Sequence, residues 1–319
     1  MSCIELLTND AFYAGRRQFS LSRIAELKAE AKRSAILSDR KLSLFVAGSL
    51  GRLEMGEKSD IDFFPITLHK KYGESYLKTC QVVSELATLN EKFEGPTFSN
   101  DGRFLRLYRL SELIDRTGYE DDDSGNHFTT RMLLLLEGRA LLNESGVNRV
   151  RKDVAKHYFR DSRGKSSFRP LFLINDMLRY WRTLCLNYEI VRNEARPWRK
   201  KNINLKFSRM VTVFGSVMAI LTEPVDNAEK LISLCNSTPM ERLAASIDRI
   251  GDQGLLSEFP QVLGLYRQFL EWKEEEDIEQ RLDGLRDEIS ESAAEFADFI
   301  YRGLFSNKVP KELQRYLVI

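Results

Sequence analysis

The strand-forming segments of this sequence are confined to its first half, whereas the second half has only helical periodicity. The short apolar run 42–47 suits a buried strand, and 59–66 is a second strand candidate that we expect to end at Pro65 or soon after. Residues 104–110 alternate well enough for a third strand. From about residue 150 onward, apolar spacing predicts helices over 168–192, 203–221, 226–250, 257–281 and 283–304. This division predicts an α+β fold in which a small mixed-sheet domain precedes an all-helical domain.

Other periodic segments complete the outline. Apolar residues at helical spacing predict a helix within 10–40 that ends at a turn at Ser38 and Asp39, a second over 72–91 and an apolar one over 128–142. The acidic stretch 120–125 is expected to be a loop. On the helix over 72–91, the expected buried face carries Tyr76, Cys80, Val83 and Ala87. We therefore expect a helical N-terminal extension over 1–40, a small α/β domain over 41–148 and a helical domain over 149–319.

Composition excludes a chain disordered throughout, a collagen and a low-complexity repeat protein. Hydrophobic residues make up 43% of the 319 residues and charged residues 30%, which is an ordinary globular mixture. The formal charge of +1 gives no argument for a protein that coats nucleic acid, although it leaves room for a local basic patch. No apolar run in the sequence reaches membrane-spanning length and no signal peptide is visible, so we expect no membrane partner.

The cysteines indicate a reducing compartment, and the histidines give no sign of a zinc site. The four cysteines form no CxxC pair, and the three histidines have no metal-ligand spacing. We expect free, buried thiols and a cytoplasmic location. These cysteines are Cys3, Cys80, Cys185 and Cys235.

The most specific signal is a glycine–serine turn followed closely by paired aspartates, placed where two predicted strands would bracket it. The residues read Gly48-Ser49-Leu50-Gly51-Arg52-Leu53-Glu54 and then Ser59-Asp60-Ile61-Asp62-Phe63. Asp60 and Asp62 are two apart on a predicted strand, so both side chains should leave the same face. Ile61 and Phe63 should then point into the core. Two carboxylates on one face form a hard oxygen site of the kind that Mg²⁺ prefers.

The glycines of the turn favour contact with a phosphate. Because Gly48 and Gly51 lack a Cβ, the backbone can come close to a ligand there. Backbone N–H groups and the Ser49 hydroxyl can hold phosphates at a helix start, and Arg52 adds a charge-assisted donor. The stretch is neither a Walker A loop nor a Rossmann fingerprint, because it lacks Gly-Lys-Ser/Thr and the GxGxxG spacing. Two unrelated turns are the alternative interpretation.

This pattern resembles the signature of the nucleotidyltransferase fold of the DNA polymerase β superfamily. The likeness is greatest to the branch that contains the protein-PII uridylyltransferases, and it covers about residues 40–145. Residues 131–142, which end Leu-Glu-Gly-Arg-Ala-Leu-Leu, are similar to a helix that follows the catalytic sheet in that branch. The resemblance implies that Gly48, Ser49 and Arg52 bind the phosphates of an NTP. It also implies that Asp60 and Asp62 are catalytic and bind Mg²⁺ or Mn²⁺.

The chain departs from the family pattern in two respects. The PII-modifying enzymes usually carry an HD hydrolase domain, and no histidine here is followed by aspartate, so we expect no uridylyl-removing activity. The superfamily commonly has a third metal-binding carboxylate on a later strand. The nearest candidate here is Asp101, along with Glu94, and Asp101 fits a plain Asn-Asp-Gly turn equally well.

The helical half adds one basic cluster. In the superfamily, a helical domain after the catalytic one often supplies lysine and serine to the nucleotide phosphates. Lys206, Ser208 and Arg209 suit that role chemically, so the resemblance makes them candidate nucleotide-binding residues. A basic solvated face and a contact surface for nucleic acid are the alternatives.

Together these features predict a metal-dependent nucleotidyltransferase over 41–148 that moves an NMP group from an NTP to a protein or RNA acceptor. The acceptor would be a protein side chain, as in the PII-modifying enzymes, or an RNA end, as in toxin-type relatives. A non-catalytic module that binds nucleotide and regulates a partner is the alternative from another class. No motif in the sequence fixes the base or the acceptor.

Overall fold

The computed structural model describes residues 1–96, 98, 102, 105–165, 167–194, 198–275 and 277–317, and it has an α+β fold. The chain divides into two compact units. Unit 1 comprises Met1–Ala14, Gly164–Asp226 and Asn236–Ile319, and unit 2 comprises Gly15–Arg163 and Asn227–Cys235. Neither unit is one continuous segment. The expected boundary after residue 148 falls inside helix α9 (Glu144–Tyr158), and the expected extension over 1–40 is shared between the units.

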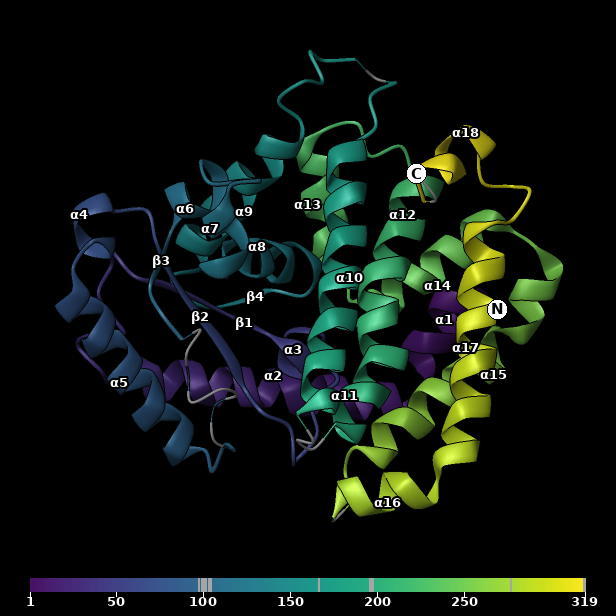
Figure 1. The fold of residues 1–319 in the computed structure, drawn as a ribbon, viewed down its shortest axis with the longest axis horizontal. Helices are drawn as coiled ribbons and strands as arrows, with labels where there is room; N and C mark the ends of the chain where they lie inside the picture. Colours follow the sequence, from purple (N-terminus) through teal and green to yellow (C-terminus); the bar gives the residue numbers. More distant parts are fainter. Residues whose placement is uncertain are drawn as a thin grey trace. The chain divides into compact units, whose positions relative to one another are not determined.

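Within the described residues, unit 2 is built on a four-stranded mixed sheet of order β3-β2-β1-β4 (Figure 1). The strands are β1 (Ser43–Ala47), β2 (Asp62–Thr67), β3 (Tyr108–Arg109) and β4 (Arg139–Leu142). β1 pairs antiparallel with β2 and β4, and β2 pairs parallel with β3. The β1–β2 register places Ala47 opposite Asp62, so the end of one strand meets the start of the other.

The first two predicted strands are confirmed with shifted ends. β1 begins one residue later than expected, and β2 begins at Asp62 instead of residue 59. Pro65 lies inside β2 instead of ending it; β3 pairs only with Ile66 and Thr67, so beside Pro65 one edge of β2 has no ladder partner in the described residues. The third predicted strand is reduced to β3, and its expected first residue, Phe104, lies outside the described residues.

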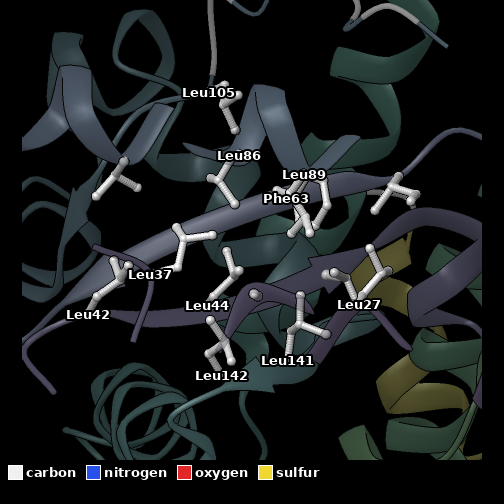
Figure 2. Packing of buried hydrophobic residues seen from close by; sticks show 14 of the residues in the cluster. Leu27, Leu37, Leu42, Leu44, Phe63, Leu86, Leu89, Leu105, Leu141 and Leu142 are labelled. Carbon is white, nitrogen blue, oxygen red and sulfur yellow. The ribbon is translucent and has the colours of Figure 1, made fainter. Parts of the chain in front are cut away.

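Alternation along the strands gives the sheet two buried faces. Leu44, Val46 and Phe63 belong to a cluster with residues of α2 (Ala11–Ala31) and α5 (Tyr76–Lys92), as Figure 2 shows in part. On the opposite face Phe45 stacks on Phe64 with ring centroids 4.9 Å apart, and α8 (His127–Leu136) and α9 contact β1. Asp62 has the same strand parity as Phe64, so it belongs to the α8 face.

The face predicted for helix 72–91 is not the one that is most buried, although one of its residues, Val83, packs partly buried against the core cluster. In α5 the buried side chains include Val82, Leu86 and Leu89, while Tyr76 is 79% exposed and Cys80 is exposed. Apolar residues occupy two neighbouring stripes of this helix, and the stripe that carries the leucines is the one that packs on the sheet. All four cysteines of the chain are described and are free thiols, but only Cys3 and Cys235 are buried as expected; Cys185 is half-buried and Cys80 is exposed.

Two expectations for residues 120–142 are also wrong. The acidic stretch forms a short helix, α7 (Glu120–Ser124), because acidic side chains are favourable in a first helical turn and Asp122 gains a buried partner. The apolar run is not one helix, because α8 ends at Leu136 and the chain reverses into β4. A run of leucines satisfies a buried helix and a buried strand equally, so its composition did not reveal the break.

Unit 2 has four further helices in the described residues, three of them short and one, α13, from much later in the chain. They are α3 (Gly48–Gly51), α4 (Lys70–Gly73), α6 (Leu110–Ile114) and α13 (Ala228–Asn236).

The single helix expected over 226–250 is wrong, because α13 ends at Asn236. Pro239 begins a new helix, and the Thr238 side chain caps its N-terminus.

In the described residues, every regular secondary-structure element of unit 1 is a helix. Its helices are α1 (Cys3–Asn9), α10 (Leu171–Asn193), α11 (Arg199–Asn204), η2 (Leu205–Arg209), η3 (Val211–Gly215), α12 (Ser216–Thr222), α14 (Pro239–Ile250), α15 (Gln253–Trp272), α16 (Ile278–Gly284), α17 (Arg286–Leu304), α18 (Lys311–Gln314) and η4 (Arg315–Leu317). η2 and η3 are π-helical turns. Phe207 is central to the core, where it stacks on Phe269 at 5.0 Å and packs against Phe296.

One helical segment of the described chain is long and apolar enough to cross a membrane, although the sequence has no uninterrupted apolar run of that length. Arg199–Thr222 has a window of mean hydropathy 1.3, and 67% of that window is buried inside the protein. A mostly buried core helix meets the same length and composition test, so this segment is weak evidence for a membrane.

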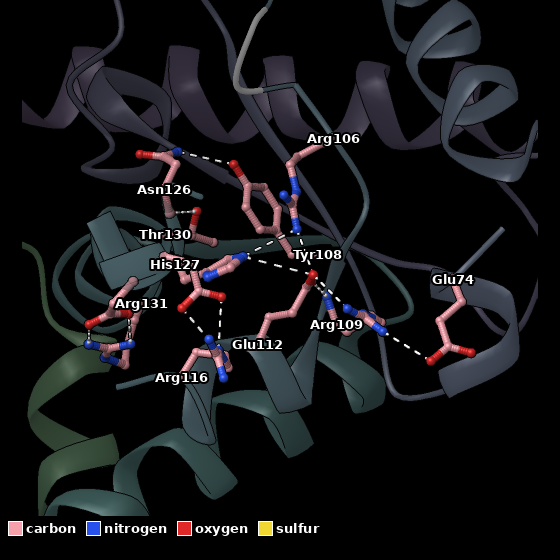
Figure 3. A network of polar contacts seen from close by, with 12 residues as sticks. Glu74, Arg106, Tyr108, Arg109, Glu112, Arg116, Asn126, His127, Thr130 and Arg131 are labelled. Carbon is pink, nitrogen blue, oxygen red and sulfur yellow. Dashed lines mark hydrogen bonds and ion pairs between the residues drawn. The ribbon is translucent and has the colours of Figure 1, made fainter. Parts of the chain in front are cut away.

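Helix α8 is fixed in unit 2 by a fully buried ion pair (Figure 3). The Arg131 guanidinium donates to both carboxylate oxygens of Asp122, at 3.0 and 2.9 Å, and to the Tyr158 hydroxyl at 2.9 Å. Neither side chain of the pair has exposed surface. Burial alone would lower the pKa of Arg131, but Tyr158 and Asp122 raise it above its ordinary value, so the guanidinium stays charged.

Replacing the buried acid should destabilise the protein strongly. Asp122→Asn should lower the free energy of unfolding by about 3–5 kcal/mol, because the buried Arg131 loses its counter-ion. Asp121→Asn is the matched control, since Asp121 pairs with Arg116 at the surface and its loss should cost at most about 1 kcal/mol. Urea unfolding followed by circular dichroism measures both. Equal losses in the two variants would contradict a dominant role for the buried pair.

Candidate functional site

The glycine turn after β1 has a backbone conformation and a close contact that only glycine permits. Gly48 has φ +66°, in the left-handed region. A Cβ built on Gly48 would overlap the Oδ2 atom of Asp62. The missing side chain therefore leaves the space in which the Asp62 carboxylate lies against the turn.

Glu137, at the end of α8, holds this turn from the other side. Its Oε1 atom accepts a hydrogen bond from the Gly48 N–H at 3.1 Å, and its Oε2 atom accepts from Arg52 Nη1 at 2.7 Å. Arg52 Nε also donates to Glu54 Oε1. The Arg52 and Glu137 side chains are 3% and 0% exposed, so this is a buried cluster of one cation and two carboxylates.

Backbone contacts clamp α3 against the same segment. A Cβ on Gly51 would collide with the carbonyl oxygen of Glu137, so the two chains approach as closely as glycine allows. Arg139 Nε donates to the Gly51 carbonyl at 2.7 Å. Residues 85 or more apart in sequence thus fix the position of the turn on both sides.

Ser49 carries the signal that points to a ligand. The residue is 5% exposed, and its hydroxyl has no hydrogen-bond partner among the described residues. A buried hydroxyl without a partner costs about 1–3 kcal/mol, so such groups are rare unless a bound molecule satisfies them. The unpartnered Ser49 Oγ, one residue after Gly48, marks the turn as a candidate binding site.

The paired aspartates differ in their surroundings. Asp62 is half-buried as the first residue of β2, whereas Asp60 is exposed and precedes the strand, so the strand alternation expected to align them does not extend to Asp60. Ile61 and Phe63 are each 4% exposed in the core, as expected. Among the described residues no group of three or more His, Cys, Asp or Glu side chains is placed to hold a metal ion. Asp101, the candidate third ligand, lies outside the described residues.

The basic cluster of the helical half belongs to unit 1, on the π-helical turn η2. Lys206 is half-buried; burial lowers its pKa, and Arg286 adds to the shift. Ser208 is 1% exposed and its hydroxyl donates to the Asn204 carbonyl at 3.2 Å, so this group already has a partner. Arg209 is half-buried on the same turn.

Glu137 is the site residue that sequence reasoning did not single out. Its only signal was an acidic residue directly after a run of leucines, within the Leu-Glu-Gly-Arg stretch. Arg52, expected to contact phosphates, lies in the buried cluster with Glu54 and Glu137. No protein-family model, curated protein or solved structure matches this chain. The candidate site is therefore defined by its own geometry.

Removing the cation of the buried cluster tests whether Arg52 is structural. Arg52→Met should lower the free energy of unfolding by about 3–5 kcal/mol, because two buried carboxylates lose their common partner. Arg33→Met, which breaks an exposed pair with Glu30, should cost at most about 1 kcal/mol. Denaturant unfolding measures both. An Arg52 variant as stable as the wild type would show that the cluster does not hold the turn.

Proposed function

We propose that this protein is a Mg²⁺- or Mn²⁺-dependent nucleotidyltransferase that moves an NMP group from an NTP to a protein or RNA acceptor and releases pyrophosphate. One observation carries the proposal: a buried, unpartnered serine hydroxyl follows a left-handed glycine that packs against an aspartate. This arrangement supports phosphate binding beside a carboxylate, which a nucleotidyl transfer needs.

In this proposal the Ser49 hydroxyl donates a hydrogen bond to a phosphate of the NTP. The Gly48 N–H is already bound to Glu137, so Gly48 contributes by leaving space for Asp62. A phosphate oxygen would satisfy the buried Ser49 hydroxyl, and the charge of the acceptor would strengthen the hydrogen bond. Arg52 acts as a positioning residue, because it ties Glu54 and Glu137 together beneath the turn.

Asp60 and Asp62 are the residues that would hold the metal ion. Both supply hard oxygen donors, and the space beside Gly48 leaves the Asp62 carboxylate next to the proposed phosphate position. When bound, Mg²⁺ supplies charge stabilisation for the phosphate oxygens of the NTP. Mg²⁺ commonly keeps several waters and completes its shell with substrate phosphates, so two protein carboxylates suit it.

A nucleotide-binding regulatory module is the second candidate. The observation that favours it is that Asp60 and Asp62 do not belong to any group of three potential ligands in the part of the chain that the structure describes. The two proposals predict the same NTP binding and differ in turnover. Incubation of the full chain with each labelled NTP, Mg²⁺ and a cell extract separates them, because only the enzyme labels an acceptor.

Replacing the half-buried aspartate should abolish transfer. Asp62→Asn keeps the shape of the side chain but removes the charge that binds the metal ion, so labelling of the acceptor should fall at least about 100-fold, or roughly 3 kcal/mol. Glu57→Gln is the matched control, because it removes an exposed acid from the same loop and should leave labelling unchanged. Wild-type labelling by the Asp62 variant, with its fold verified by circular dichroism, would overturn the metal assignment.

Removing the serine hydroxyl should separate binding from stability. Ser49→Ala should weaken NTP binding by about 1.5–3 kcal/mol, or roughly ten- to a hundred-fold, because the phosphate loses a charge-assisted hydrogen bond. The free energy of unfolding without NTP should stay the same or rise, because the substitution removes a buried group that has no partner. Calorimetric NTP titration and urea unfolding measure the two quantities. Unchanged NTP affinity would reject the phosphate role of Ser49.

A further inference from the structure

A second concave site lies in unit 2 at the opposite end of β1 from the glycine turn. The cavity has a volume of about 380 Å³ and is lined by the segment after α2 and by the junction of β4 with α9. That size falls within the usual range for small-molecule sites. Leu42 lines it and precedes Gly48 by six residues, which corresponds to about 20 Å of extended strand. The cavity is therefore separate from the candidate NTP site.

Two cations line this cavity without partners. Among the residues that the structure describes, neither the Lys32 ammonium nor the Arg40 guanidinium has a hydrogen-bond or ion-pair partner, and both residues are exposed. Asp39 also lines the cavity, and its carboxylate accepts a hydrogen bond from the neutral Lys41 N–H at 2.9 Å. The formal charges of Lys32, Arg40 and Asp39 sum to +1, so the lining favours an anionic ligand.

The floor of the cavity is apolar and held in place. Leu37, Leu42 and Leu142 line it and are at most 5% exposed; Figure 2 shows these three leucines within the core cluster. The Asn143 side-chain amide donates to the carbonyls of Arg40 and Leu42, at 3.2 and 3.1 Å. These bonds connect the end of β4 to the start of β1, so the wall exists before any ligand binds.

We propose that this cavity binds a small organic phosphate, with the phosphate group between Lys32 and Arg40 and the apolar body on the three leucines. A phosphate group carries up to two negative charges and has three acceptor oxygens, so it can accept hydrogen bonds from both cations at once. A carboxylate carries only one negative charge, and inorganic phosphate has no apolar body to cover the leucines. The proposal is independent of the proposed transferase activity.

Calorimetric titration of the full chain with simple probes tests the ligand class. Phenyl phosphate should bind at least ten-fold more tightly than inorganic phosphate and than benzoate. Equal binding of inorganic phosphate would overturn the role of the leucine floor. Equal binding of benzoate would overturn the assignment of a phosphate.

Variants locate the binding. The double variant Lys32→Gln and Arg40→Gln should weaken phenyl phosphate binding at least ten-fold, and because both side chains are exposed the fold should be retained. Lys28→Gln, in the last turn of α2 before the cavity lining begins, and Ser49→Ala should both leave it unchanged. An equal loss in Lys28→Gln would indicate general charge attraction and overturn the site. A loss in Ser49→Ala with none in the double variant would place the probe at the glycine turn and also overturn it.

Discussion

The Glu137 carboxylate is the contact on which the candidate site depends. One of its oxygens accepts from the Gly48 N–H and the other from Arg52, so a single buried side chain sets both the glycine turn and the cation below it. Glu137 is delivered by α8, which is itself fixed through Arg131 and Asp122. The buried Arg131–Asp122 pair thus fixes α8, and α8 in turn fixes Glu137 and the glycine turn that Glu137 contacts.

Such buried charges are not an efficient source of stability. Moving ions out of water costs several kcal/mol each, and apolar residues of similar volume often stabilise a core equally well. The cluster around Arg52 instead fixes the conformation of the glycine turn, because its hydrogen bonds are satisfied in one arrangement of that turn. The unsatisfied Ser49 hydroxyl is a local cost of the same kind, and a buried polar group of this sort calls for an explanation such as a bound ligand.

Local patterns made part of this structure predictable. The strand β1 and the turn at Gly48 follow from short-range composition, and the helical second half follows from its periodicity. The role of Glu137 could not be read in the same way, because its partner Arg52 lies 85 residues earlier and only the β1–β4 pairing brings them together. The leucine run before Glu137 hid β4 for a related reason, since burial on all sides removes the periodicity that distinguishes strand from helix.

The interleaved order of the two units constrains how the protein is made on the ribosome. The strands of unit 2 are complete once residue 142 has emerged, but α13, which belongs to the same unit, follows more than eighty residues later. Until then its buried residues, Leu231 among them, cannot cover their part of unit 2, and Lys152 lacks its partner Glu229. Unit 2 is therefore synthesised with part of its surface uncovered until α13 has emerged, after part of unit 1.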